Sequence, residues 1–218
     1  MMETPEQNRN VFAIKKFLSE YLDLRKDKDN ELETVDSIRK GVEFKGANLW
    51  ILIFAIFMAS LGLNVNSTAV IIGAMLISPL MTPILGVGFA LAILDTKLLK
   101  KSFKILFIQV AVSLLASTLY FLISPISYAS TEIIARTSPT IWDVVIAFVG
   151  GLAGIIGARK KEANNIVPGV AIATALMPPV CTVGYSIATG NLEYMVVASY
   201  LFSINCSFIM ITHILALM

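Results

Sequence analysis

The stretch NSTAVIIGAMLISPLMTPILGVGFAL, residues 66–91, is apolar enough to lie in a membrane and long enough to cross one, yet Ser78-Pro79 and Thr82-Pro83 interrupt it. Proline removes a backbone donor from a helix and moves the residue before it out of the helical region. A hydroxyl residue followed by proline is also a typical helix start. The stretch therefore predicts one half-helix that ends near Ser78 and a second that begins between Pro79 and Pro83.

The break is expected at depth in the membrane. From Asn66 to Pro79 is 13 residues, which is about 20 Å of helix in a hydrocarbon core roughly 30 Å thick. Backbone groups freed at that depth have to be buried in protein or line a cavity. Either packing or function must therefore explain the break.

A second stretch, NIVPGVAIATALMPPVCTVGYSIATG at residues 165–190, has the same layout, because Asn165 to Pro178 is again 13 residues. A shift of 99 positions places Asn66 on Asn165 and Pro79 on Pro178. The apolar segments that precede the two stretches also match, at a shift of 92 positions. We expect an internal repeat with a break in each copy, and two unrelated proline-kinked helices are the alternative.

The composition is that of a membrane protein. Of the 218 residues, 56% are hydrophobic and only 15% are charged, whereas about a quarter are charged in soluble domains. The apolar residues concentrate after Gly46, which predicts an all-α integral membrane domain preceded by a polar arm over residues 1–46. The arm has two amphipathic helical patterns, expected to pack on the protein or on a neighbouring subunit, with the membrane interface as the alternative. No apolar run near the N-terminus has the form of a cleavable signal peptide.

Six membrane segments are predicted, with the second and fifth broken in mid-membrane, over residues 47–63, 66–94, 104–123, 139–157, 166–188 and 193–217. Each is close to the roughly 20 residues that a crossing needs. The domain 47–218 then divides into repeat one, 47–124, and repeat two, 138–218. Three segments per repeat is an odd number, so the two repeats are inverted in the membrane, as in many secondary transporters.

Basic residues are unevenly divided between the connections. Most lie in Lys97–Lys104 and Arg159–Lys161, and the other connections hold only Arg136, against Glu132 and Glu193. Because positive loops stay inside, we expect a multi-pass protein of the prokaryotic cytoplasmic membrane with both termini in the cytoplasm.

The broken ends are the expected functional site. A half-helix N-terminus offers unpaired N–H groups and a C-terminus offers unpaired carbonyls, so two facing breaks can hold a polar or charged solute. The residues expected along this substrate or ion path are Asn66, Ser78, Pro79, Thr82, Pro83, Asn165, Thr174, Pro178, Pro179, Thr182 and Asn205. The alternative is that the hydroxyls only cap the broken ends and that Asn205 only bonds a neighbouring helix.

The remaining polar residues favour no enzyme. The one histidine, His213, excludes a two-histidine metal motif, and no nucleophile elbow or phosphate loop occurs. Asp143 and His213 lie near segment ends and are expected to be boundary residues, not a proton path. Cys181 and Cys206 are expected to be free buried thiols, and no cofactor or metal is expected.

Two stretches carry a family resemblance: ASLGLNVNSTAVIIGAMLISPLMTPILGVG, Ala59–Gly88, and VPGVAIATALMPPVCTVGYSIATG, Val167–Gly190. They resemble the signature stretches of a prokaryotic membrane family, the domain of unknown function three-eight-nine, and the resemblance covers roughly residues 34–215. Some relatives carry a larger soluble domain before the membrane part. The resemblance implies membership but no particular activity.

We therefore expect a transporter that moves a small solute or ion through a midplane site formed by two broken helices. Its expected partners are membrane lipid, that solute or ion, and further copies of itself in a homo-oligomer, with no nucleic acid. A channel is the alternative of the same kind. A non-transporting scaffold or regulatory protein is the alternative of another class.

Overall fold

The structure, a computed structural model, describes residues 46–158 and 166–217, with side chains over 46–153, 176–212, 214 and 215. The predicted arm, apart from Gly46, lies outside the described residues, as do Arg159–Lys161 and Asn165. The side chains of Thr174 and His213 lie outside them as well.

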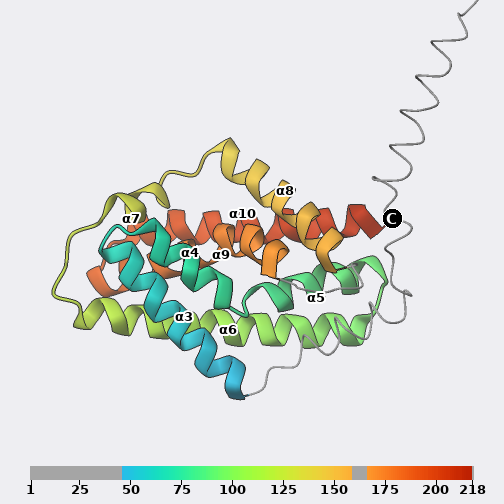
Figure 1. Cartoon of the computed structure of the whole chain (residues 1–218), viewed down its shortest axis with the longest axis horizontal. Helices are drawn as coiled ribbons and strands as arrows, with labels where there is room; N and C mark the ends of the chain where they lie inside the picture. Colours follow the sequence, from blue (N-terminus) through green and yellow to red (C-terminus); the bar gives the residue numbers. More distant parts are fainter. Residues whose placement is uncertain (1–45, 159–165, 218) are drawn as a thin grey trace, which may run out of the picture.

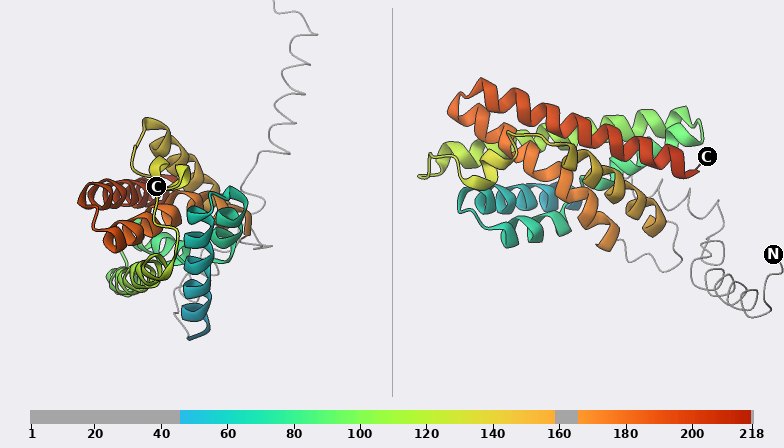
Figure 2. Two further views of the ribbon diagram at one scale, coloured as in Figure 1. Left: turned by 90° about the vertical axis from the view of Figure 1, so that its left-hand side faces the viewer. Right: turned by 90° about the horizontal axis from the view of Figure 1, so that it is seen from above.

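Helices make up the regular structure of the described ranges: α3 Gly46–Asn64, α4 Thr68–Ile77, α5 Met81–Ala92, α6 Thr96–Ile123, α7 Thr131–Ala135, α8 Ile141–Ala158, α9 Ile166–Thr189 and α10 Leu192–Leu217. This confirms the all-α class. The long helices run roughly along one axis of the molecule, and short α7 lies at one end, where α9 turns into α10 (Figure 1). The C-terminus lies at the opposite end (Figures 1 and 2).

Three of the described helices are long and apolar enough to cross a membrane, namely α3, α6 and Leu192–Thr212 of α10. The pair α4 and α5 passes the same test as one span, bent by 56° at its break. The apolar part of α8 over Ile141–Ala153 is shorter. The chain is therefore a membrane protein with several spanning helices.

Helix α6 has its polar face turned inward. Ser102, Gln109 and Ser113 are buried, whereas Phe103 is 50% exposed and Phe107 is 76% exposed. Water would make this arrangement unfavourable, because apolar surface is driven out of water. Lipid reverses the preference, because apolar side chains can face the hydrocarbon while polar ones turn toward the other helices.

The predicted break in the second segment is confirmed. Helix α4 ends at Ile77, Ser78 is extended with φ −74° and ψ 129°, and α5 begins at Met81. Ser78 takes this conformation because it precedes Pro79, whose ring disfavours a helical residue before it.

The predicted break in the fifth segment is wrong. Helix α9 continues from Ile166 to Thr189 with Pro178 and Pro179 inside it. These prolines remove the donors for only two carbonyls, those of Thr174 and Ala175. Neighbouring helices hold the axis, since every residue from Leu176 to Ser186 is buried, and packed helices in membranes tolerate proline for this reason.

The third segment begins earlier than predicted. Helix α6 starts at Thr96 and not near residue 104, so the basic cluster Lys97–Lys104 lies on its first turns. The Asp95 side chain accepts hydrogen bonds from the backbone N–H groups of Lys97 and Leu98, both at 3.0 Å. This N-cap satisfies the first donors of the helix and lets it begin before the apolar run.

Helix α9 occupies the centre of the molecule and packs against α3, α4, α6, α8 and α10. Leu80 from the α4–α5 break belongs to the same buried cluster as Met177 and Cys181 of α9. A second cluster joins Ile84 of α5 to Leu176 and to Ile209 of α10. Residues next to the break and next to the two prolines of α9 therefore share two buried clusters.

Candidate functional site

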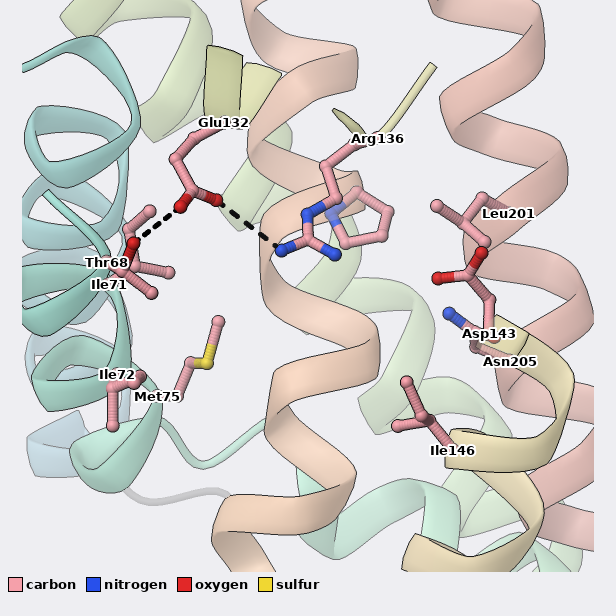
Figure 3. A pocket seen from close by; sticks show the side chains of 11 residues that line it. Thr68, Ile71, Ile72, Met75, Glu132, Arg136, Asp143, Ile146, Leu201 and Asn205 are labelled. Atoms are coloured by element: carbon pink, nitrogen blue, oxygen red, sulfur yellow. Dashed lines mark hydrogen bonds and ion pairs between the residues drawn. The ribbon is translucent and has the colours of Figure 1, made fainter. Parts of the chain in front are cut away.

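A cavity of about 230 Å³ lies between α4, α7, α8, α9 and α10 (Figure 3). Its wall includes charged, polar and apolar side chains, from Thr68, Ile71, Ile72, Met75, Glu132, Arg136, Asp143, Ile146, Pro179, Leu201 and Asn205. Thr68, Glu132 and Asp143 stand in first helical turns. Pro179 and Asn205 stand near the middle of α9 and α10, so the cavity extends from the helix ends toward the centre of the bundle.

The Glu132 side chain forms both a hydrogen bond and an ion pair at the cavity. Its Oε1 accepts a hydrogen bond from the Thr68 hydroxyl at 2.6 Å, and its Oε2 lies 3.6 Å from a terminal nitrogen of Arg136 (Figure 3). The Nε of Arg136 is buried and has no hydrogen-bond partner among the described residues. Glu132 is therefore neutralised, whereas Arg136 has donor capacity left.

Helix α7 owes its position to the turn between α3 and α4. The Ser130 hydroxyl caps α7 by accepting from the Ile133 N–H at 3.3 Å, and it donates to the Leu63 carbonyl. Asn66, at φ 58°, accepts from the Thr131 hydroxyl at 2.6 Å and from the Glu132 N–H at 3.1 Å. Asparagine suits this left-handed position because its short amide side chain bonds locally. Asn66 thus holds α7, and Glu132 with it, at the mouth of the cavity.

Asp143 stands in the first turn of α8, across the cavity from Glu132 (Figure 3). Its Oδ2 accepts from the backbone N–H and from the hydroxyl of Thr140, both at 2.8 Å. This is the reciprocal bond of a capping box, which fixes the carboxylate in place. In the described ranges no basic side chain forms an ion pair with Asp143, so its charge is uncompensated there.

Two predicted site residues line the inner part of the cavity. Asn205 is 2% exposed, and it lies beside Leu201 on the face of α10 turned toward Pro179. Asn205 is 13 residues from the start of α10 and Pro179 is 13 residues from the start of α9. Both are therefore about 20 Å along their helices.

The residues at the α4–α5 break lie outside the cavity lining. The Ser78 hydroxyl accepts from the Leu80 N–H at 3.4 Å, and the Thr82 N–H donates to the Pro79 carbonyl at 3.3 Å. Pro83 is buried within the first turn of α5. Only the Ser78 bond involves a hydroxyl, and the N-cap of α5, Leu80, has no side-chain cap bond.

Among the predicted residues of α9, Pro179 lines the cavity, but Pro178 and Thr182 do not. Pro178 is buried, and Thr182 is buried with no hydrogen-bond partner for its Oγ1 among the described residues. Thr174 lies within α9, and Asn165 lies outside the described residues.

Sequence reasoning missed the three charged residues of the cavity. The sequence alone places Glu132 and Arg136 in a connection between segments and indicates a boundary position for Asp143. Their spacing could have indicated a site, since three charges fall within residues 132–143 between two apolar segments. That spacing does not reveal that α7 folds back over the cavity. In the described part of the chain, no group of three His, Cys, Asp or Glu residues could hold a metal ion.

Comparison with known proteins gives one family and one relative. A family model described as a domain of unknown function (DUF389) matches residues 75–211, a narrower range than the expected 34–215. An uncharacterized protein of Methanocaldococcus jannaschii is 31% identical over 158 residues, which are 72% of this chain and 49% of that protein. The chain thus spans about half the length of the curated relative it matches. No solved structure matches it.

Proposed function

The chain belongs to the DUF389 family, and from that premise we propose that it is a membrane transporter that moves a small solute or ion through the cavity beside α9. One observation carries the proposal. A cavity of about 230 Å³ combines a charged mouth with an inner wall that contains buried Asn205. Polar groups at membrane depth are costly and mark functional paths in membrane proteins.

The helices around the cavity also offer an element that can move. Helix α4 is only 10 residues long and is separated from α5 by a 56° bend. A β-carbon added at Gly73 of α4 would meet nothing within 4 Å, so this face of the helix is open. A short segment with a hinge at one end is the kind of element that gates transport by rigid-body motion.

In the proposed arrangement the chain crosses the cytoplasmic membrane six times, with α3, α4–α5 and α6 as one half and α8, α9 and α10 as the inverted other half. The alternating direction of these segments along the long axis supports it (Figure 1). The continuity of α9 means that the two halves differ in their proline segments.

The proposed orientation puts Lys97–Lys104 on the cytoplasmic side, because basic residues flanking membrane helices favour the inside. Cysteines introduced at Lys100 and at Asn191 in a Cys181→Ala, Cys206→Ala background would be treated with an impermeant thiol reagent in intact cells. We expect labelling at position 191 only. Labelling at position 100 only would reverse the orientation.

The test of transport fills the cavity without touching its charges. Ile72 and Leu76 both stand on α4 and are 41% and 45% exposed, but only Ile72 lines the cavity. The protein would be reconstituted in proteoliposomes and its flux measured for a panel of radiolabelled monovalent ions and small amides. Ile72→Trp should abolish a flux that the wild type supports, and Leu76→Trp should leave that flux unchanged.

A wild type that supports no flux above protein-free vesicles would contradict the transporter proposal and favour the scaffold alternative. Equal flux in both tryptophan variants would place the path elsewhere in the molecule. Thermal unfolding in detergent would establish that both variants fold.

A further inference from the structure

The cavity carries a net negative charge. Glu132 is paired with Arg136 at 3.6 Å and also accepts a bond from Thr68. Asp143 receives two bonds from Thr140 but no ion pair from a described residue. The three charged residues among the described wall residues therefore sum to one excess carboxylate. A monovalent cation would neutralise the excess carboxylate, whereas an anion would be repelled by it.

The wall also has an extended apolar part. Ile71, Ile72 and Met75 of α4 face Ile146 of α8 and Leu201 of α10 across the cavity. An inorganic divalent cation needs about six oxygen ligands, and such a wall would leave most of them missing. An organic cation needs one counter-charge and apolar contact for its carbon part.

The polar groups specify which organic cation fits. Quaternary ammonium groups are recognised by aromatic faces, and none of the described residues that line the cavity is aromatic. The Asp143 carboxylate and the Thr68 hydroxyl instead present oxygen atoms that can accept hydrogen bonds. A protonated amine with N–H groups can donate to such oxygens, and a tetraalkylammonium ion cannot.

The volume of the cavity limits the size of the solute that it can hold. About 230 Å³ corresponds to roughly seven or eight water molecules at about 30 Å³ each. A solute of about that many non-hydrogen atoms would fill the space.

We propose that the cavity between α4, α7, α8, α9 and α10 binds small protonated primary or secondary amines, with the ammonium group at Asp143 and the alkyl part against the apolar wall. This inference names the substrate class of the proposed transporter, and it rests on the proposed function for the statement that the amine is carried. Binding itself can be measured without transport.

The test is calorimetric titration of the purified full-length protein in detergent at neutral pH. The probes are n-butylammonium, tetramethylammonium, sodium and butyrate, which separate N–H donation, the sign of the charge and the presence of an alkyl part. We expect n-butylammonium to bind at least about tenfold more tightly than each of the others, a difference of 1.4 kcal/mol. Tighter binding of butyrate would assign the cavity to anions through Arg136, and equal binding of sodium would assign it to inorganic cations. Either result overturns the inference, as does the absence of binding.

The decisive variant is Asp143→Asn, whose amide oxygen can still accept from Thr140 and keep the helix start intact. Its matched control is Glu193→Gln, because Glu193 is also an acidic residue in a first helical turn, that of α10, but lies outside the cavity. Asp143→Asn should weaken n-butylammonium binding by about tenfold or more, and Glu193→Gln should not change it. Equal binding by both variants overturns the inference.

The binding and flux experiments can contradict the amine class and the transport proposal independently of each other. Amine binding that depends on Asp143, in a protein that supports no flux, would contradict the proposed transport and keep the site. Flux of another solute that Ile72→Trp blocks, without amine binding, would keep transport and contradict the amine class.

Discussion

The α4–α5 segment and α9 each contain two prolines, but only the α4–α5 segment is broken at them. Pro79 and Pro83 accompany a bend of 56° and a gap of three residues between helices. Pro178 and Pro179 lie inside a helix that runs from Ile166 to Thr189.

Part of the difference is local. Pro83 is the third residue of α5, in the first turn, where N–H groups have no helical partner in any case. Ser78 is extended, and its N–H bonds the Met75 carbonyl at 3.3 Å, which satisfies one end of α4. The break thus costs few hydrogen bonds, whereas a break at Pro178 would free a full turn of buried backbone.

The rest of the difference comes from neighbouring helices. Around the α4–α5 break, Leu76 and Ile77 are 45% and 46% exposed. In α9 the prolines are buried, and six other helices pack against α9 along its length. Prolines specify where donors are missing, but the surrounding packing decides whether the helix axis breaks there.

The largest expected effect comes from enlarging a residue of α9 where the packing is closest. A β-carbon at Gly184 would lie 2.4 Å from the Ser117 Oγ and 3.0 Å from the backbone nitrogen of Thr118. Gly184→Leu should therefore lower the free energy of unfolding by at least about 3 kcal/mol, the upper part of the usual cost of overpacking. Reversible unfolding in mixed micelles would measure it.

Gly73→Leu is the matched control, since a β-carbon at Gly73 of α4 would contact nothing within 4 Å. It should leave stability unchanged or raise it by up to about 1 kcal/mol, the difference in helix propensity. If both variants lose the same stability, the contrast between an enclosed α9 and an open α4 is wrong.

An intermediate effect is expected from removing one proline of each pair. Pro178→Ala gives the Thr174 carbonyl a backbone donor and should stabilise the protein by about 1–3 kcal/mol. Pro79→Ala should change stability by less than about 1 kcal/mol, because Ser78 already bonds Met75. The same unfolding assay compares the two, and an equal gain in both would mean that proline alone maintains the break.

The smallest effect is expected at the connection between α4 and α7. Asn66→Ala removes the acceptor for the Thr131 hydroxyl and the Glu132 N–H, a cap worth about 1 kcal/mol. Hydrogen exchange in α7 should become faster.

Asn191→Ala is the control for that variant, because Asn191 caps α10 by accepting from the Tyr194 N–H at 3.1 Å. It should cost similar stability and leave exchange in α7 unchanged. Slow exchange in α7 after Asn66→Ala would show that other contacts hold this helix over the cavity.

The sequence by itself determined the membrane class, the family, the approximate bounds of the long helices and the break at Ser78. The class, the bounds and the break follow from apolar run length and from the effect of proline on its own turn, which act over a few residues. The family follows from the resemblance of Ala59–Gly88 and Val167–Gly190. Of the residues predicted along the path, Pro179 and Asn205 line the cavity.

Only the tertiary structure decided the continuity of α9 and the place of the cavity. Thr68 and Glu132 are 64 positions apart and meet because Asn66 and Ser130 hold α7 against the α3–α4 turn. Asp143 faces them from a third helix. Such contacts depend on how several helices pack, and no pattern within one helix specifies its neighbours.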